Sequence, residues 1–372
     1  MKRLVVLLPL LVVAGCATLD DFLASIRKDQ GSIALEQRPI EMPIAPNSFV
    51  LTHADQSVVG VPQVVFTRSE DTLSDLAREY GLGYDEIVTA NPGIDPWLPG
   101  KNTPIVLPTQ FVLPSTPRKG VILNIATKRL FYYPEAADGE QQQVLTYPIG
   151  IGRVGWETPL GATTVVSKAK DPSWWVPASV RQEHVELGDP LPAVVPPGPD
   201  NPLGTRVLKL DMPGYLIHGT NQPYGVGMRV SHGCVRLYPE NIELLYTLVG
   251  IGESVMIVNE PYQMGWQDGI LYFEAHEPLK DDAVSAEQRL QALLDKQVDA
   301  AARPLNNHLQ DHVRSLAKSA SGIPLSVVTY DANEFMVRAR VVENTVEMDP
   351  NAPTLTEIRE MMDDVGDETE SL

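Results

Sequence analysis

Short runs of β-branched, aliphatic and aromatic residues dominate the stretch from residue 119 to residue 259, and Gly, Pro, Asn or Asp closes most of them. Runs of about four to eight such residues have the length and composition of β-strands. Residues 121–125 and 129–133, separated by Ala126-Thr127-Lys128, predict a hairpin. The 32 prolines also favour strands and extended loops, because proline breaks helix interiors. We therefore expect a mainly β protein.

Acidic residues outnumber basic ones. Lys and Arg total 29 and Asp and Glu total 48, which gives a formal net charge of −19. A surface of this sign disfavours binding to a phosphate backbone, so we expect no nucleic-acid partner. Residues 347–372 carry nine acidic side chains and one Arg, and we expect a disordered acidic tail there. No cofactor is predicted.

The first sixteen residues have the pattern of an export signal. Two basic residues precede an apolar run at residues 4–13, and Ala14-Gly15-Cys16 follows. The run is too short to span a membrane, which takes about 20 residues, and is typical of a signal peptide. Val13-Ala14-Gly15-Cys16 resembles a bacterial lipobox. The resemblance implies removal of residues 1–15, lipidation of Cys16 and, with Ala17 next, a periplasmic protein tethered to the outer membrane. An ordinary signal peptide with a chance Cys is the alternative.

The rest of the chain divides by composition. We expect a tether at residues 16–60, a small domain at 61–112, the β domain at 119–259 and a mixed α/β extension at 260–346 that contains no motif we can interpret.

The small domain has the order strand, helix, helix, strand. Its first helix is expected near residues 72–80, capped by Ser69 or Asp71. Residues 71–77 with Tyr80, Asn91-Pro92-Gly93 and the closing residues 105–108 resemble a LysM domain, a βααβ module that binds N-acetylglucosamine-containing glycans. A structural appendage that binds no ligand is the alternative.

His218 and Cys234 are the residues with the clearest chemistry. A strand delivers His218, and Cys234 follows Ser231-His232-Gly233 in a tight turn that leads toward a helix. If Cys16 is lipidated, Cys234 has no disulfide partner. A thiol in such a turn, with a nearby imidazole and free backbone N–H groups, suits acyl transfer. We expect His218, Arg236 and backbone dipoles to lower its pKa. A zinc site and a buried structural Cys are the alternatives; the spacing of common zinc sites is absent, so no metal is predicted.

The run from His218-Gly219-Thr220 to Ser231-His232-Gly233-Cys234-Val235-Arg236-Leu237 resembles the signature of the bacterial L,D-transpeptidases, which have a YkuD-type catalytic domain. The resemblance extends over about 140 residues and implies a β-sandwich catalytic fold. It implies that Cys234 is the nucleophile and His218 its base, oriented by the carbonyl of Gly219. The N–H groups of Gly233 and Cys234 would hold the oxyanion, and Ser231, His232 and Arg236 would shape the site and contact substrate.

The same resemblance implies the reaction. Cys234 would attack the bond between diaminopimelate and D-Ala in a peptidoglycan tetrapeptide stem, release D-Ala and form a thioester. An acceptor amine from another stem, or from a Lys of an outer-membrane lipoprotein or β-barrel, would resolve it, and carbapenems should acylate the thiol. Water as acceptor would make the protein an L,D-carboxypeptidase. The residues also leave open a non-catalytic peptidoglycan-binding lipoprotein and a cysteine peptidase that cleaves proteins.

Overall fold

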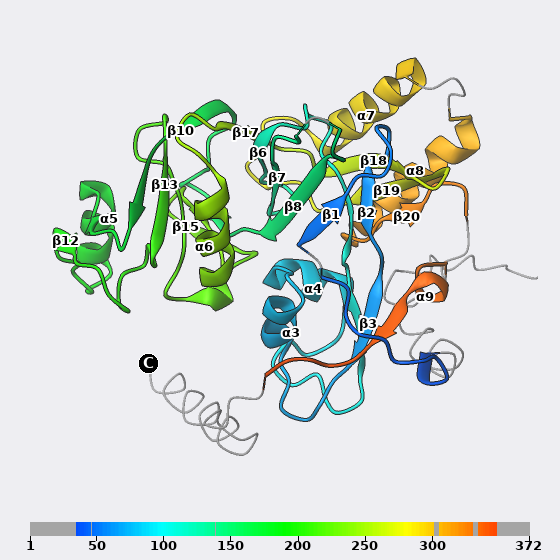
Figure 1. The fold of residues 1–372 in the computed structure, drawn as a ribbon, viewed down its shortest axis with the longest axis horizontal. Coiled ribbons are helices and arrows are strands. Elements are labelled where there is room, and N and C mark those ends of the chain that lie inside the picture. Colours follow the sequence, from blue (N-terminus) through cyan, green and yellow to red (C-terminus); the bar gives the residue numbers. More distant parts are fainter. Residues whose placement is uncertain (1–34, 46, 138, 301–304, 330–333, 348–372) are drawn as a thin grey trace, which may run out of the picture.

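A computed structural model describes residues 35–45, 47–137, 139–300, 305–329 and 334–347. The predicted signal peptide, Cys16 and nearly all of the predicted acidic tail lie outside these residues. Within them, strands are the principal secondary structure, which confirms the mainly β prediction (Figure 1).

The largest element is a nine-stranded sheet, the main sheet, with the order β1-β8-β7-β6-β17-β10-β13-β14-β16. The predicted hairpin is confirmed, because β6 and β7 pair in antiparallel register. Two pairs are parallel, β17 with β6 and β14 with β16. The nine strands are β1 (Ser48–Val50), β6 (Gly120–Asn124), β7 (Arg129–Tyr133), β8 (Gln143–Pro148), β10 (Gly161–Lys170), β13 (Arg206–Leu210), β14 (Leu216–His218), β16 (Val235–Arg236) and β17 (Ser254–Val258).

Both faces of the main sheet are covered at β6 and β7. Side chains alternate between the faces of a strand, so Leu123 and Leu130 join the core beneath α6 (Pro239–Leu248), while Ile122 and Phe131 join a second core. The second core contains Leu73, Leu76 and Ile87 of the small domain. The small domain and the main sheet therefore share one hydrophobic core.

The small domain forms a βααβ segment of β3 (Gln63–Phe66), α3 (Leu73–Glu79), α4 (Tyr84–Ala90) and β4 (Pro104–Leu107). Thr72 caps α3 and makes a capping box with Asp75, so neither Ser69 nor Asp71 is the cap. Asp71 is instead buried and accepts a hydrogen bond from Arg68 N–H at 2.6 Å.

The expected tether and extension are both partly built into these sheets. β1 pairs with β8, and β2 (Val58–Gly60) pairs with β5 (Gln110–Val112), so residues 48–50 and 58–60 of the predicted tether belong to sheets. From the other end of the chain, β21 (Arg340–Val342) pairs in parallel with β3. The other elements of the extension are β18 (Tyr262–Gln267), β19 (Ile270–Ala275), α7 (Ala286–Ala300), α8 (Asn307–Ser319), β20 (Leu325–Ser326) and α9 (Glu334–Arg338).

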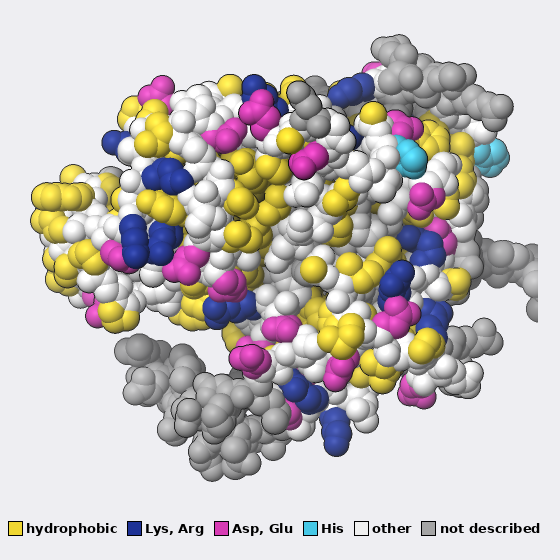
Figure 2. Space-filling view, in the orientation of Figure 1, with side chains coloured by type: hydrophobic (Ala, Val, Ile, Leu, Met, Phe, Trp, Pro, Cys, Tyr) yellow, Lys and Arg dark blue, Asp and Glu magenta, His cyan; other side chains and the backbone are white. Residues whose placement is uncertain are grey.

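A flap projects from the far end of the main sheet, at the left of Figure 1. It consists of β11 (Trp174–Trp175), α5 (Ala178–Glu186) and β12 (Val194–Val195), where β11 pairs with β12. Val180 is the buried residue of α5, and Trp175 and Leu187 are exposed. Figure 2 shows hydrophobic side chains gathered at this end. Within the described ranges, no helix is long and apolar enough to cross a membrane.

Candidate active site

Parallel pairing of β14 with β16 brings the two ends of the motif together. Ile217 pairs with Val235, and His218 pairs with Arg236. Cys234 directly precedes β16, so it lies level with Leu216, two residues from His218 along the neighbouring strand. By the alternation of strand side chains, the positions of His218 and Arg236 lie on the face opposite to the buried pair Ile217 and Val235. Register thus places Cys234 diagonally across from His218, on the last two strands of the main sheet.

His218 is buried, with 3% of its surface exposed. Its Nδ1 atom lies 2.6 Å from the carbonyl oxygen of Gly219, so Nδ1 carries the proton and donates it. Burial, reinforced by the positive charge of Arg236, lowers the pKa of His218 to about 3 despite this bond. At neutral pH the ring is uncharged, and its Nε2 atom is the nitrogen with a free lone pair.

The thiol of Cys234 is partly exposed and donates to the carbonyl oxygen of Gly214 at 3.6 Å. Burial raises its pKa, and a backbone hydrogen bond from Leu216 and the charge of Arg236 oppose the rise without cancelling it. The expected lowering of the thiol pKa is therefore wrong, because loss of hydration outweighs the nearby charge. Among the described residues, no hydrogen bond joins the sulfur to His218. The free site holds a neutral thiol and a neutral imidazole.

Ser231 and Thr158 fix the turn that carries the thiol. Buried Ser231 donates to the carbonyl oxygen of Cys234 at 2.5 Å and accepts from Gly233 N–H at 3.2 Å. Thr158 donates to the carbonyl oxygen of Gly233 at 2.9 Å and accepts from Gly152 N–H at 3.1 Å. Gly233 has φ +100°, and a Cβ there would lie 2.9 Å from the ring of Tyr215. The turn is held by side-chain hydrogen bonds and requires glycine.

Of the two N–H groups predicted to hold the oxyanion, one already donates a hydrogen bond within the protein. Gly233 N–H is bonded to Ser231, whereas Cys234 N–H has no acceptor within the described ranges. The Cys234 N–H is therefore the one of the two that is available to donate a hydrogen bond to an oxyanion at this turn.

His232 links the turn to the flap. Its Nε2 atom lies 2.6 Å from the Glu183 carboxylate of α5 and 3.2 Å from the guanidinium of Arg153. Arg153 also pairs with Glu183, and the ring of Trp156 meets the imidazole edge-on at 4.8 Å. Hydrogen bonds from Arg153 and His232 lower the pKa of Glu183. No role for Glu183 or Arg153 could be predicted from the sequence, because their pairing depends on the position of the flap.

Arg236 brings an unneutralised charge to the site. Its backbone pairs with Gly150 through two 2.9 Å hydrogen bonds, but its Nε atom is buried without a partner and no ion pair involves its guanidinium in the described structure. Burial lowers the pKa of Arg236. A buried guanidinium without an ion-pair partner can bind a carboxylate of an incoming substrate.

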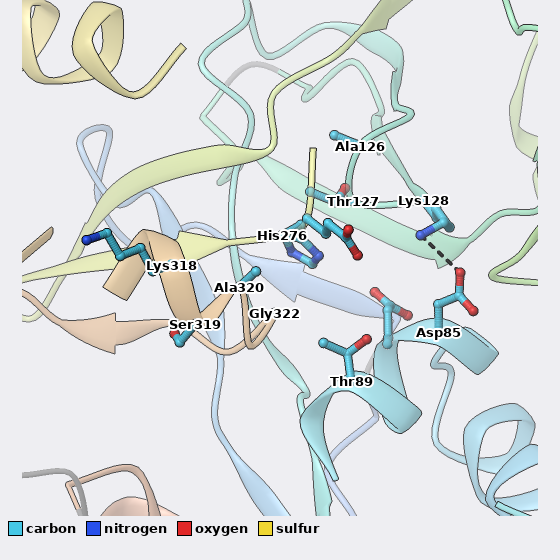
Figure 3. Close-up of a pocket in the computed structure, with 12 residues that line it drawn as sticks. Asp85, Thr89, Ala126, Thr127, Lys128, His276, Lys318, Ser319, Ala320 and Gly322 are labelled. Carbon is cyan, nitrogen blue, oxygen red and sulfur yellow. Dashed lines mark ion pairs between the residues drawn. The ribbon is translucent and has the colours of Figure 1, made fainter. Parts of the chain in front are cut away.

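A separate polar pocket of about 610 Å³ lies away from this motif (Figure 3). Asp85 and Thr89 of α4, Lys128 of the β6–β7 turn and His276 of the extension line it, and Lys128 pairs with Asp85 at 3.0 Å. Neither His218 nor Cys234 contributes. No group of three or more His, Cys, Asp or Glu side chains suited to a metal ion occurs in the part of the chain that is described.

Known proteins are similar over both the motif and its surroundings. Residues 118–257 match the model of the YkuD family, the L,D-transpeptidase catalytic domain. The "Probable L,D-transpeptidase YcfS" of Escherichia coli K12 is 35% identical over 296 residues, which cover 77% of this chain and 90% of that protein. The "Probable L,D-transpeptidase YbiS" of the same strain is 42% identical over 226 residues, which cover 60% of this chain and 72% of that protein. A solved catalytic domain of the E. faecium L,D-transpeptidase is 21% identical and covers 39% of this chain and 100% of that chain; its TM-score of 0.29 is too low to compare the folds in detail.

Proposed function

This chain belongs to the L,D-transpeptidase family and acts on peptidoglycan as an L,D-transpeptidase, and from that premise we propose that Cys234 is its nucleophile and His218 its general base. The observation that carries the proposal is the parallel register of β14 and β16, which brings the two residues to one edge of the sheet. The bond from His218 to Gly219 supports it further, because it leaves Nε2 as the basic nitrogen.

The reaction begins from a neutral pair. Cys234 Sγ attacks the carbonyl carbon of the bond between diaminopimelate and D-Ala, and its proton passes to His218 Nε2. The N–H of Cys234 donates a hydrogen bond to the tetrahedral oxyanion and stabilises it. The N–H of Gly233 can donate a second hydrogen bond to the oxyanion once its bond to Ser231 breaks. Collapse breaks the C–N bond, the departing amine of D-Ala takes the proton from His218, and a thioester remains on Cys234.

Deacylation reverses these proton transfers. An acceptor amine attacks the thioester and gives its proton to His218, which returns it to the departing thiolate of Cys234. The product is a new amide bond and a regenerated thiol. Stem amines and protein Lys side chains are the acceptors we propose, and water would give the carboxypeptidase reaction.

Arg236 has a proposed role in binding substrate. Its buried charge opposes protonation of His218, which the mechanism requires. A carboxylate of the stem peptide bound to the guanidinium would remove that opposition, so substrate binding and activation of the base would reinforce one another. Ser231 and His232 act on the turn rather than on the substrate in this scheme, through their bonds to Cys234, Gly233 and Glu183.

The finer parts of the architecture belong to the same proposal. We assign the β-sandwich to residues 119–259, supported by the match to the catalytic-domain family, and a LysM-like role in glycan binding to residues 61–112, supported by the motifs in that segment. Lipidation of Cys16 would anchor the protein in the outer membrane, with its active site facing peptidoglycan in the periplasm.

Incubation of the purified protein with tetrapeptide-containing muropeptides tests the proposal, with D-Ala release as the readout. Wild type should release D-Ala and carry a thioester detectable by mass spectrometry. Cys234→Ala should do neither, and Cys234→Ser controls for the size of the side chain. Release of D-Ala by Cys234→Ala would refute the assignment. A reaction that contains both stem peptides and a Lys-ended acceptor peptide identifies the acceptor, and hydrolysed stems as the sole product would identify a carboxypeptidase.

A further inference from the structure

Two glycines bring the backbone of the βααβ segment against the backbone of the active-site loop. Gly83 lies in the turn between α3 and α4, and Gly227 lies in the loop that connects His218 to Cys234. A Cβ on Gly83 would lie 2.7 Å from Gly227 Cα, and a Cβ on Gly227 would lie 2.6 Å from the carbonyl carbon of Gly83. Neither position has room for a side chain, so the two chain segments touch main chain to main chain.

Directional hydrogen bonds fix this contact. The N–H of Tyr84 donates to the carbonyl oxygen of Val226 at 3.1 Å. The hydroxyl of Tyr238, the residue that caps α6, donates to the carbonyl oxygen of Leu82 at 3.1 Å. The α3–α4 turn (residues 80–84) is thus bonded on one side to the active-site loop and on the other to the start of α6.

The α3–α4 turn is itself rigid, because a buried ion pair holds it. Arg129 of the main sheet is 1% exposed and bonds the Glu86 carboxylate at 2.7 and 2.9 Å and the carbonyl oxygen of Gly81 at 3.0 Å. Glu86 in turn accepts from Gly83 N–H at 2.5 Å. Movement of Gly83 would break bonds inside a desolvated cluster, which is costly.

The loop that receives this contact continues directly into the nucleophile turn. Met228, next to Gly227, accepts a hydrogen bond from Ile151 N–H at 3.0 Å. The following strand β15 (Arg229–Ser231) pairs with β9 (Ile151–Gly152) and ends at Ser231, whose side chain bonds the carbonyl of Cys234. Gly227 is thus connected through β15 to the turn that carries Cys234.

We propose that the α3–α4 turn positions the nucleophile turn, with Gly83 and Gly227 as positioning residues, so that the βααβ segment is part of the catalytic unit. The inference rests on the proposed function of Cys234 and extends it to a segment that carries none of the reacting groups. A βααβ segment that served only to bind glycan would need no close backbone contact with this loop.

A matched pair of glycine substitutions tests the contact. Gly227 has φ +88° and Gly252 has φ +87°, so Ala carries the same backbone strain at both positions, but a Cβ on Gly252 meets nothing within 4 Å. We expect Gly227→Ala to lower kcat for D-Ala release by about 10- to 100-fold, since small misplacements of a reacting group have effects of this size. Gly252→Ala should stay within about twofold of wild type. A structural role alone would lower the melting temperature of Gly227→Ala and leave kcat of the folded protein unchanged.

Two milder variants keep the test decisive if Gly227→Ala does not fold. Gly83→Ala adds the same steric conflict at φ −88°, without left-handed strain. Tyr238→Phe removes only the bond to Leu82. Both should lower kcat with little change in KM, and normal kcat in these folded variants would overturn the inference.

A substrate-independent readout separates this inference from the proposed function. In full-length protein with Cys16→Ser, Cys234 is the single thiol, and its alkylation rate by iodoacetamide reports its placement. We expect that rate to change more than about threefold in Gly83→Ala and Gly227→Ala and to match wild type in Gly252→Ala. If wild type released no D-Ala, the proposed function would fail while the alkylation rates still decided the positioning. Equal alkylation rates in all variants would refute the positioning itself.

Discussion

Replacement of His218 by Gln should change how the stability of this protein depends on pH. The unfolded imidazole titrates near its usual pKa of about 6.5, whereas burial lowers the pKa of His218 in the folded protein to about 3. Between these values the unfolded chain binds a proton that the folded chain does not. The free energy of unfolding must therefore fall as the pH drops through this window.

The size of the effect follows from the two pKa values. Between about pH 7.5 and pH 5, the His218 contribution to the free energy of unfolding should fall by about 2 kcal/mol. The acidic groups with lowered pKa values add to this slope only near the acidic end of the range, and wild type and His218→Gln carry the same acidic groups, so their contribution cancels in the comparison. Burial also lowers the pKa of His232 and His312. These two residues should therefore add the same amount to the slope in wild type and in His218→Gln.

Urea unfolding at several pH values in this range measures the slope. His218→Gln is expected to be less stable at pH 7.5, because it loses the bond to Gly219, but to lose about 2 kcal/mol less than wild type on acidification. Cys234→Ala is the control and should keep the wild-type slope, since the raised pKa of the thiol lies above the window. Identical slopes for wild type and His218→Gln would show that the pKa of His218 does not change on folding, and the reasoning from its burial would be wrong.

Three further predictions concern groups around the site. Arg129→Met should lower the free energy of unfolding by about 3–5 kcal/mol in urea, because it leaves the Glu86 carboxylate buried without its partner; full stability would contradict this reasoning. Thr158→Val should cost about 1–3 kcal/mol in the same assay, because it removes the hydrogen bond to the Gly233 carbonyl, and an unaffected protein would show that another group takes its place. Glu183→Gln should lower kcat for D-Ala release by about tenfold with a nearly unchanged melting temperature, while Glu183→Asp restores part of the loss; an unchanged kcat would mean that the flap does not influence the thiol.

Features that depend only on residues close together in the sequence could be predicted from the sequence. The β6–β7 hairpin could be predicted from two apolar runs and a three-residue turn, and the structure confirms it. His218 and Cys234 could be named as candidates because a strand ends at His218 and because the polar, glycine-rich turn at Cys234 is unusual in a core strand. Their catalytic roles stay a prediction.

Features that depend on tertiary contacts could not be predicted. The direction of the thiol pKa is set by how deeply Cys234 is buried, which the motif does not encode. Helix α5 has Val180 as its buried residue, so its sequence lacks the apolar periodicity that would have revealed a helix. Glu183 on that helix could not be matched with His232 without the position of the flap. The glycines at 83 and 227 become informative only when the two backbones are seen in contact.

The pairing of β21 with β3 has a consequence for how the molecule is made. Strand β3 pairs with β4, which is close in the sequence, but it gains its second neighbour only once residues 340–342 are available. Arg38 likewise donates to the carbonyl oxygen of Met336 across 298 residues. Contacts of such long range slow folding, because distant segments must meet before either gains stability. A ribosome or an export channel that still holds residues 340–342 would leave the sheet of β3, β4 and β21 without one of its edge strands. Sheet formation in this part of the molecule is therefore complete only after residues 340–342 are free to pair.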